Sequence, residues 1–258
     1  MDATASKDTA SLGERFAAAR LQAIGEISDP QGIGRLSERS LHRIVKYFTE
    51  PDMRYHEVKH AGFVCDIMRD GRITEIQTGA FSKLKRKLDV FLKEASVNVI
   101  YPLHKSKYIR YIDADTGEIT PPKKSPKHQS IYSSAYELYN IREYLSHERL
   151  TVTLMFFESD EYKLRGIKHK IGRRYRGCER AECIPIRLLD IVTLKSEADY
   201  KIFLPETLPD EFCAADFNRA VGHGFSDGYS VIAILQSVGL LSEGRREGRR
   251  VLYTRLDK

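Results

Sequence analysis

The chain contains no tryptophan and few cysteines, four among 258 residues. The cysteines have neither the paired spacing of a zinc site nor that of a disulfide framework, so we expect reduced thiols at Cys65, Cys178, Cys183 and Cys213. The sequence also lacks an apolar run long enough to cross a membrane, and it shows no signal-peptide pattern. These absences argue against a membrane partner and favour a cytoplasmic location.

The composition is that of a folded protein with a basic surface. Hydrophobic residues make up 41% of the chain, the formal net charge is +6 and the isoelectric point is near 9.0. The length suits one large domain and a small one, and the charge suits a polyanionic partner. We expect a mobile segment or loose helix over 1–35, a large α/β domain over 36–204 and a small domain over 205–258.

A tight β-hairpin is the strongest local signal in the sequence. Asp70-Gly71 separates two β-prone runs, and a type I′ turn needs positive φ at both of its central residues. If these two residues form the loop, Arg69 pairs with Arg72. The register of the whole hairpin then follows by counting outward from the turn.

This register brings two acids together. Asp66 falls directly opposite Glu75, with Cβ atoms about 5 Å apart, and Gln77 lies on the same side of its strand as Glu75. Two facing carboxylates repel each other unless a proton or a cation neutralises them. Oxygen ligands favour Mg²⁺, Mn²⁺ or Ca²⁺ over zinc. The alternative is a solvated hairpin face with both acids in water.

The flanking segments have readable periodicities. Apolar residues at helical spacing predict a helix that begins after Ser37 and ends near Pro51, and a second helix over 81–93. Alternation predicts strands over 55–60, 97–102 and 150–157. With the hairpin, the order from residue 36 to 103 is helix, three strands, helix, strand.

That order, with its Asp-bearing strand and Glu-x-Gln strand, resembles the core of the PD-(D/E)xK nuclease superfamily. The resemblance implies a restriction-endonuclease-like αβββαβ core with a mixed sheet, in which Asp66 and Glu75 bind Mg²⁺ or Mn²⁺. The family most often has a lysine where this chain has Gln77, and the departure is similar to the Glu-x-Gln variant of some restriction endonucleases. Two further residues become candidates. Glu38 corresponds to a first-helix acid that often joins the metal site, and Lys59 could replace the absent lysine; the alternatives are an exposed first-turn acid and a solvated strand edge.

Basic residues are candidates for binding a nucleic-acid backbone. Lys83, Arg86 and Lys87 lie outside the apolar stripe of the second helix, where they either contact phosphates or merely solubilise the helix. Arg173 and Arg174 belong to a basic stretch over 163–180 that is interrupted by glycines. This pattern is typical of a flexible loop that contacts nucleic acid, or of a solvated insertion.

The last section predicts helices over 214–221 and 226–238, followed by a hairpin with arginines at its tip. This arrangement, over 208–256, resembles a winged helix-turn-helix domain, with Arg245, Arg246, Arg249 and Arg250 in the wing. The second helix contains no lysine or arginine. Nonspecific contact with the DNA backbone and docking of a protein partner therefore both stay open.

Taken with the resemblance, these features predict a metal-dependent nuclease that hydrolyses phosphodiester bonds in DNA. The amide of Gln77 cannot act as a base, so the metal or Lys59 must fill that role. The alternative is a catalytically inactive nuclease fold that binds DNA or regulates another process. DNA is the expected partner, and a homodimer is left open.

Overall fold

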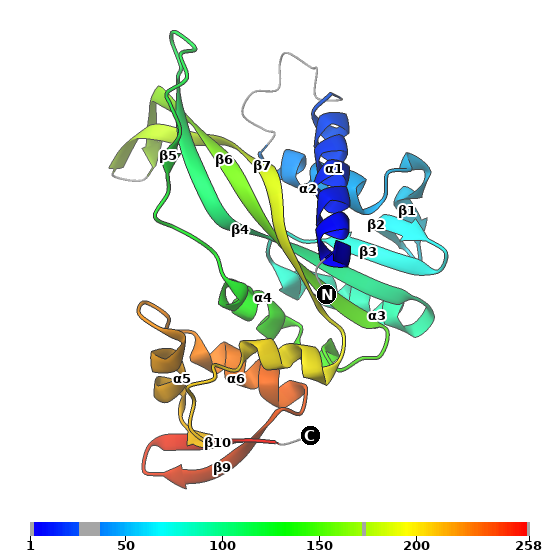
Figure 1. Ribbon diagram of the computed structural model, residues 1–258, viewed down its shortest axis with the longest axis vertical. Helices are drawn as coiled ribbons and strands as arrows, with labels where there is room; N and C mark the ends of the chain where they lie inside the picture. Colours follow the sequence, from blue (N-terminus) through cyan, green and yellow to red (C-terminus); the bar gives the residue numbers. More distant parts are fainter. Residues whose placement is uncertain (1–2, 26–36, 172–173, 257–258) are drawn as a thin grey trace. The chain divides into compact units, whose positions relative to one another are not determined.

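The protein has a mixed α/β architecture (Figure 1). The structure, a computed structural model, describes residues 3–25, 37–171 and 174–256. Within these ranges, the description leaves out the side chains of 3–11, 25, 37–39, 167–171, 174–181 and 245. No helix among the described residues is both long enough and apolar enough to cross a membrane.

The larger sheet contains parallel and antiparallel neighbours. Its strand order is β1-β2-β3-β4-β6-β7, and β5 pairs with β4. β2 and β3 are antiparallel, whereas β3 and β4 are parallel. The strands are β1 (His56–His60), β2 (Phe63–Arg69), β3 (Arg72–Ile76), β4 (Ser96–Asp113), β5 (Lys123–Lys124), β6 (Leu150–Ile171) and β7 (Arg174–Leu194).

The predicted succession of elements around the hairpin is present. Helix α2 (Ser37–Thr49) precedes β1, β2 and β3, and α3 (Lys85–Glu94) lies between β3 and β4. Short 3-10 turns, η1 (Met53–Tyr55) and η2 (Phe81–Leu84), precede β1 and α3. β4 and β6 run well beyond the expected strands, because pairing with neighbouring strands continues past the apolar segments that the pattern detects.

The chain forms two compact units, each built from discontinuous segments. Unit 1 comprises 1–58, 102–129 and 155–191, and unit 2 comprises 59–101, 130–154 and 192–258. The boundary expected at residue 205 falls inside unit 2.

In unit 1, the first described residues form an ordered helix. α1 (Ala3–Gly25) packs on α2, and the buried residues among its described side chains are Phe16, Ala19 and Ala23. The Phe16 ring lies 5.9 Å from the ring of Phe48 and 5.4 Å from that of Phe157. Residues 3–25 therefore form a helix, one of the two alternatives that we expected for this segment. The sequence shows only a weak stripe here because two of the three core positions among the described side chains of α1 are alanines.

A second difference concerns the basic stretch over 163–180. The described residues of this stretch belong to β6 and β7, the two long strands of the larger sheet, and not to a flexible loop. Glycines and lysines have low β propensity, but pairing between strands outweighs a weak local preference.

In unit 2, α3 packs on the hairpin through an aromatic and aliphatic core. Leu88 and Phe91 are fully buried, and the Phe91 ring lies 5.7 Å from that of Phe63. The carboxylate of Glu137, in α4 (Ala135–Asn140), accepts hydrogen bonds from the backbone N–H groups of Ala80 and Phe81 at 3.0 and 2.7 Å. These bonds fix the start of η2 and hence the position of α3. The 3-10 turns η3 (Ile131–Ser134) and η4 (Arg142–Tyr144) flank α4.

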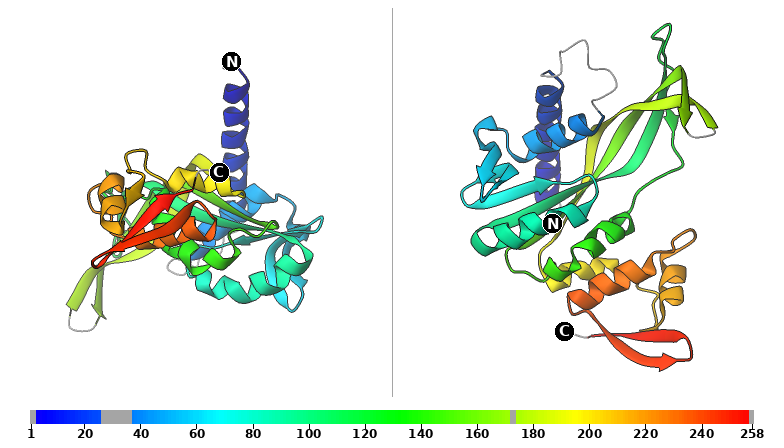
Figure 2. Two further views of the ribbon diagram at one scale, coloured as in Figure 1. Left: turned by 90° about the horizontal axis from the view of Figure 1, so that it is seen from below. Right: turned by 180° about the vertical axis from the view of Figure 1, so that it is seen from behind.

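The C-terminal elements of unit 2 are two helices and a small sheet. After the turn η5 (Glu197–Phe203) come β8 (Glu211–Phe212), α5 (Ala214–Val221) and α6 (Gly228–Ser237). The hairpin of β9 (Leu241–Glu247) and β10 (Arg250–Arg255) completes a sheet with the order β8-β10-β9. Figure 2 shows α6, in orange, beside α4, in green. The predicted order of two helices followed by a hairpin is therefore present.

Candidate functional site

The β2–β3 hairpin has the turn and register that the sequence predicts. Asp70 and Gly71 have φ angles of 49° and 72°, so both occupy the left-handed region that a type I′ turn requires. Arg69 pairs with Arg72, and Ile67 pairs with Thr74. Continuing this register by one residue on each strand brings Asp66 opposite Glu75.

Asp66 is turned toward the backbone of β3. Its Oδ2 accepts a hydrogen bond from the Ile76 N–H at 2.7 Å. The backbone pairing of β2 with β3 extends only to Ile67, so this carboxylate satisfies a backbone donor at the point where the ladder stops. One oxygen of Asp66 is thus used to hold the hairpin together.

Glu75 is the buried acid of this site, with 1% of its side chain exposed. The Lys87 ammonium, on α3, donates hydrogen bonds to Glu75 Oε2 at 2.7 Å and to the Val64 carbonyl at 2.8 Å. The other oxygen, Glu75 Oε1, is also buried and has no hydrogen-bond partner among the described residues. A buried carboxylate oxygen without a hydrogen-bond partner destabilises the fold, so this atom is suited to bind a proton or a cation.

The electrostatics of the site favour a neutralised acid. Burial raises the pKa of Glu75 from 4.5 to about 7; the hydrogen bond from Lys87 opposes this shift, and the charge of Asp66 adds to it. Burial also raises the pKa of the neighbouring Cys65 thiol to about 11, with a further contribution from Glu75. Cys65 is therefore a buried, protonated thiol at neutral pH. Cys183 and Cys213 are likewise buried and form no disulfide among the described residues, and the side chain of Cys178 lies outside those residues.

The structure describes the other residues predicted for this site to different extents. Gln77 follows β3, and its backbone N–H donates to the Ile100 carbonyl at 2.9 Å. Lys59 is exposed on β1 and makes no hydrogen bond or ion pair with either acid. Glu38 belongs to α2, but its side chain lies outside the described residues.

The predicted nucleic-acid contacts fall into two groups. Lys83 and Arg86 are exposed, as are the hairpin residues Arg246, Arg249 and Arg250. Lys87 differs, because its ammonium is bonded to Glu75 and only 24% of its side chain is exposed. The sequence signal for Lys87 was its position outside the apolar stripe, which cannot distinguish a free cation from one paired with a buried acid. Arg173, and the side chains of Arg174 and Arg245, lie outside the described residues.

Helix α6, the second C-terminal helix, is largely buried and exposes few side chains that could contact a partner. Val231, Ile234 and Leu235 of α6 are fully buried, and the helix packs on α4, α5 and β9 within unit 2. Tyr229 is its most exposed large side chain. A recognition helix must place several polar side chains in the major groove, and α6 does not provide them.

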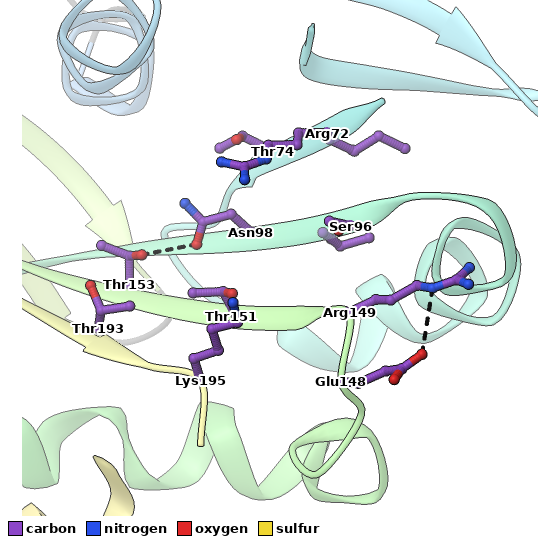
Figure 3. A pocket seen from close by; sticks show the side chains of 12 residues that line it. Arg72, Thr74, Ser96, Asn98, Glu148, Arg149, Thr151, Thr153, Thr193 and Lys195 are labelled. Atoms are coloured by element: carbon purple, nitrogen blue, oxygen red, sulfur yellow. Dashed lines mark hydrogen bonds and ion pairs between the residues drawn. The ribbon is translucent and has the colours of Figure 1, made fainter. Parts of the chain in front are cut away.

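Sequence reasoning missed a polar pocket on the other face of β3. It has a volume of about 330 Å³, and its polar lining comes from β3, β4, β6 and β7 and from the residues next to the ends of β6 and β7 (Figure 3). The signal lies in the alternation within these segments, Arg-Ile-Thr, Ser-Val-Asn, Thr-Val-Thr and Thr-Leu-Lys, where every second residue is polar. Recognising the pocket also requires the strand order, which the sequence does not supply. The polar lining residues are Arg72, Thr74, Ser96, Asn98, Glu148, Arg149, Thr151, Thr153, Thr193 and Lys195.

Comparison with known proteins places the chain in a family. Residues 39–195, more than half of the chain, match the family model described as "Domain of unknown function (DUF8091)". A protein of Treponema pallidum (strain Nichols), described as an uncharacterized protein, is 28% identical over 226 residues, which are 86% of either chain. No solved structure gives a significant match. On the extent of the family match, the chain belongs to the DUF8091 family.

Proposed function

We propose that the protein is a metal-dependent nuclease that hydrolyses phosphodiester bonds in DNA, with Asp66 and Glu75 as metal ligands. The observation that carries the proposal is the buried Glu75 carboxylate, which has one unpartnered oxygen next to a second acid on the same hairpin. The order α2, β1, β2, β3, α3, β4 also supports it, since it matches the succession in the PD-(D/E)xK core. Exposed Lys83 and Arg86 provide charge for a phosphate backbone.

The two acids fit a hydrated Mg²⁺ or Mn²⁺. Such ions keep several waters and use one or two carboxylates together with substrate phosphates. No cluster of three or more His, Cys, Asp and Glu side chains suited to a metal occurs among the described residues, so the protein would supply two carboxylates. Glu75 Oε1, which has no hydrogen-bond partner among the described residues, and the Asp66 carboxylate are the ligands that the protein would offer to the ion.

In this function each residue has a separate task. Asp66 and Glu75 hold the ion, which when bound makes a water more acidic and neutralises charge on the phosphate. Lys87 holds Glu75 Oε2 in place through its hydrogen bond. Gln77 positions the water through its amide, which can donate and accept hydrogen bonds but cannot take up a proton. In this proposal Lys87 takes the place of the lysine that is absent at position 77. Lys59 has no role in the site.

The proposal is tested by incubating plasmid, linear and branched DNA with the protein in Mg²⁺ or Mn²⁺. We expect cleavage by the wild type and at least about a hundredfold loss in Asp66→Asn, because removing a metal ligand removes the charge that holds the ion. Asparagine can still accept the bond from the Ile76 N–H, so the hairpin should be retained. Asp70→Asn is the matched control, since it neutralises an exposed acid of the same hairpin whose φ asparagine tolerates.

Absence of cleavage by the wild type on all three substrates, or equal cleavage by wild type and Asp66→Asn, contradicts the proposal. An activity that survives Asp66→Asn would have to reside elsewhere in the chain.

A second candidate is a catalytically inactive nuclease fold that binds DNA, and one observation favours it. The Lys87 ammonium already provides Glu75 with a cation at 2.7 Å, so the acid pair has internal neutralisation without a metal. Calorimetric titration with Mn²⁺ separates the two candidates. Binding that disappears in Asp66→Asn supports the nuclease, and the lack of any such binding supports the inactive fold.

A further inference from the structure

The pocket on the open face of β3 is built from one repeated feature, a polar residue at every second position of four neighbouring strands. Arg72 and Thr74 of β3 lie beside Ser96 and Asn98 of β4, with which they are paired in register. β6 contributes Thr151 and Thr153, β7 contributes Thr193, and Lys195 directly follows β7. All of these residues belong to unit 2.

The opposite faces of the same strands are apolar and buried. Ile73, Val97, Val152 and Leu194 alternate with the polar pocket residues and are almost fully buried, although Ile73 and Val97 also belong to the lining. The strands are thus anchored from one side, and the hydroxyl and amide groups on the other side are held at fixed spacing by the sheet. A rigid sheet positions ligand-binding side chains more precisely than a loop does.

The charge of the pocket is positive. Arg72, Arg149 and Lys195 contribute three cations and Glu148 one anion, so the lining carries a formal charge of +2. Arg149 is partly engaged, since it donates to the Lys93 carbonyl at 2.7 Å and lies 3.8 Å from Glu148. Arg72 and Lys195 make no ion pair with any residue that the structure describes. Their charge is available to an anionic ligand.

Hydrogen-bonding groups dominate the rest of the lining. Thr153 Oγ1 donates to Asn98 Oδ1 at 2.9 Å, which directs the Asn98 amide and leaves its N–H groups available (Figure 3). Threonine and serine hydroxyls can donate to phosphate oxygens and can also accept from the hydroxyls of a polyol. No aromatic side chain occurs among the described lining residues, so the pocket offers no platform on which a nucleobase could stack.

We infer that this pocket binds a small phosphorylated polyol, of the sugar phosphate class. The formal charge of +2 matches a phosphomonoester close to its dianionic state at neutral pH, and cation-assisted hydrogen bonds to phosphate are among the strong ones. The volume of about 330 Å³ is at the lower end of the range for small-molecule sites, about 300–1,000 Å³. Arg72 and Lys195 hold the phosphate, and the threonine hydroxyls and Asn98 contact the polyol.

The inference is independent of the proposed nuclease activity, because Arg72 and Thr74 point to the face of β3 opposite to that of Glu75. Binding is therefore measured in metal-free buffer, where failure of the nuclease proposal has no effect on the result.

The test is isothermal titration calorimetry of the full-length protein. The probes are ribose 5-phosphate, ribose, inorganic phosphate and a single-stranded DNA oligonucleotide. We expect ribose 5-phosphate to bind, inorganic phosphate to bind more weakly, and ribose to give no heat. Arg72→Gln and Lys195→Gln should each lower the affinity for ribose 5-phosphate by about tenfold, since each removes a charge-assisted hydrogen bond. Thr153→Val, which keeps the shape of the side chain but removes the hydroxyl, should lower the affinity for ribose 5-phosphate severalfold.

The matched control is Lys93→Gln, which removes an exposed cation from α3 and should bind as the wild type does. Three results overturn the inference. They are no binding of ribose 5-phosphate, binding that Arg72→Gln and Lys195→Gln leave unchanged, and pocket-dependent binding of the oligonucleotide alone, which would assign the site to a nucleic-acid backbone.

Discussion

Replacing Glu75 with glutamine should change how the stability of the protein depends on pH. The pKa of Glu75 is raised from 4.5 in an unstructured chain to about 7 in the fold, mainly by burial. Between these two values the folded state keeps a proton that the unfolded state releases. The free energy of unfolding must therefore fall as pH rises through this window, and it levels off above pH 7.

The magnitude follows from the separation of the two pKa values. About 2.5 pH units at about 1.4 kcal/mol per unit correspond to a loss of about 3 kcal/mol between pH 4.5 and pH 7. This is a large part of the stability of an ordinary domain. A glutamine at position 75 does not titrate and can still accept the bond from Lys87, so its variant should not show this part of the pH dependence.

Urea denaturation in EDTA at pH 5, 6, 7 and 8 measures the effect. The quantity of interest is the difference between variant and wild type, since other titrating groups contribute equally to both. We expect the difference to shift by about 2.5 kcal/mol in favour of Glu75→Gln from pH 5 to pH 8, because pH 5 already lies inside the titration window. Asp70→Asn, which neutralises an exposed acid of the same hairpin, should run parallel to the wild type. If the free energies of unfolding of wild type and Glu75→Gln changed in parallel with pH, Glu75 would not be a buried acid with a raised pKa.

Three further predictions concern the same hairpin. Lys87→Met should destabilise the protein by about 2 kcal/mol at pH 8 and by less at pH 5, in urea denaturation, because only the ionised Glu75 needs the ammonium. Gly71→Ala should lower the free energy of unfolding by about 1 kcal/mol, because Gly71 has a φ of +72°, which alanine rarely adopts. Gly13→Ala, within α1, should leave the free energy of unfolding unchanged or raise it. Thermal melts should therefore show a lower melting temperature for Gly71→Ala and not for Gly13→Ala. Cys65 should resist iodoacetamide in the native protein at pH 8 and react once urea unfolds it, as followed by mass spectrometry; rapid native labelling would contradict a buried thiol with a pKa of about 11.

The sequence predicts the hairpin well because its information is local. The Asp70-Gly71 turn specifies the loop, and the loop specifies the pairing of Arg69 with Arg72 and of Ile67 with Thr74. Helix α5 likewise has the predicted bounds, from Ala214 to Val221, since its apolar spacing and the glycine that follows it are also local signals.

What the sequence could not supply depends on partners distant in the chain. The partner of the acid pair, Lys87, comes from a helix twelve residues after Glu75, and helical periodicity gives only its side of that helix. The long strands β6 and β7 extend through basic, glycine-containing sequence because each has a neighbouring strand, which local propensity does not register. Helix α1 is stabilised by the packing of Phe16 against Phe48 and Phe157, which are distant in the sequence.

β3 allows the acid site and the polar pocket to be altered separately, although both depend on this five-residue strand. The side chains of Ile73 and Glu75 are buried on one face, whereas Arg72 and Thr74 provide the polar lining of the pocket on the other. Because side chains alternate strictly along a strand, Thr74→Val changes the pocket without adding or removing a group next to Glu75. This substitution should weaken sugar phosphate binding and leave the pH dependence of stability unchanged, and Glu75→Gln should do the reverse. If either variant moves both readouts, the two faces are coupled through the strand, and neither site can be assigned a function of its own.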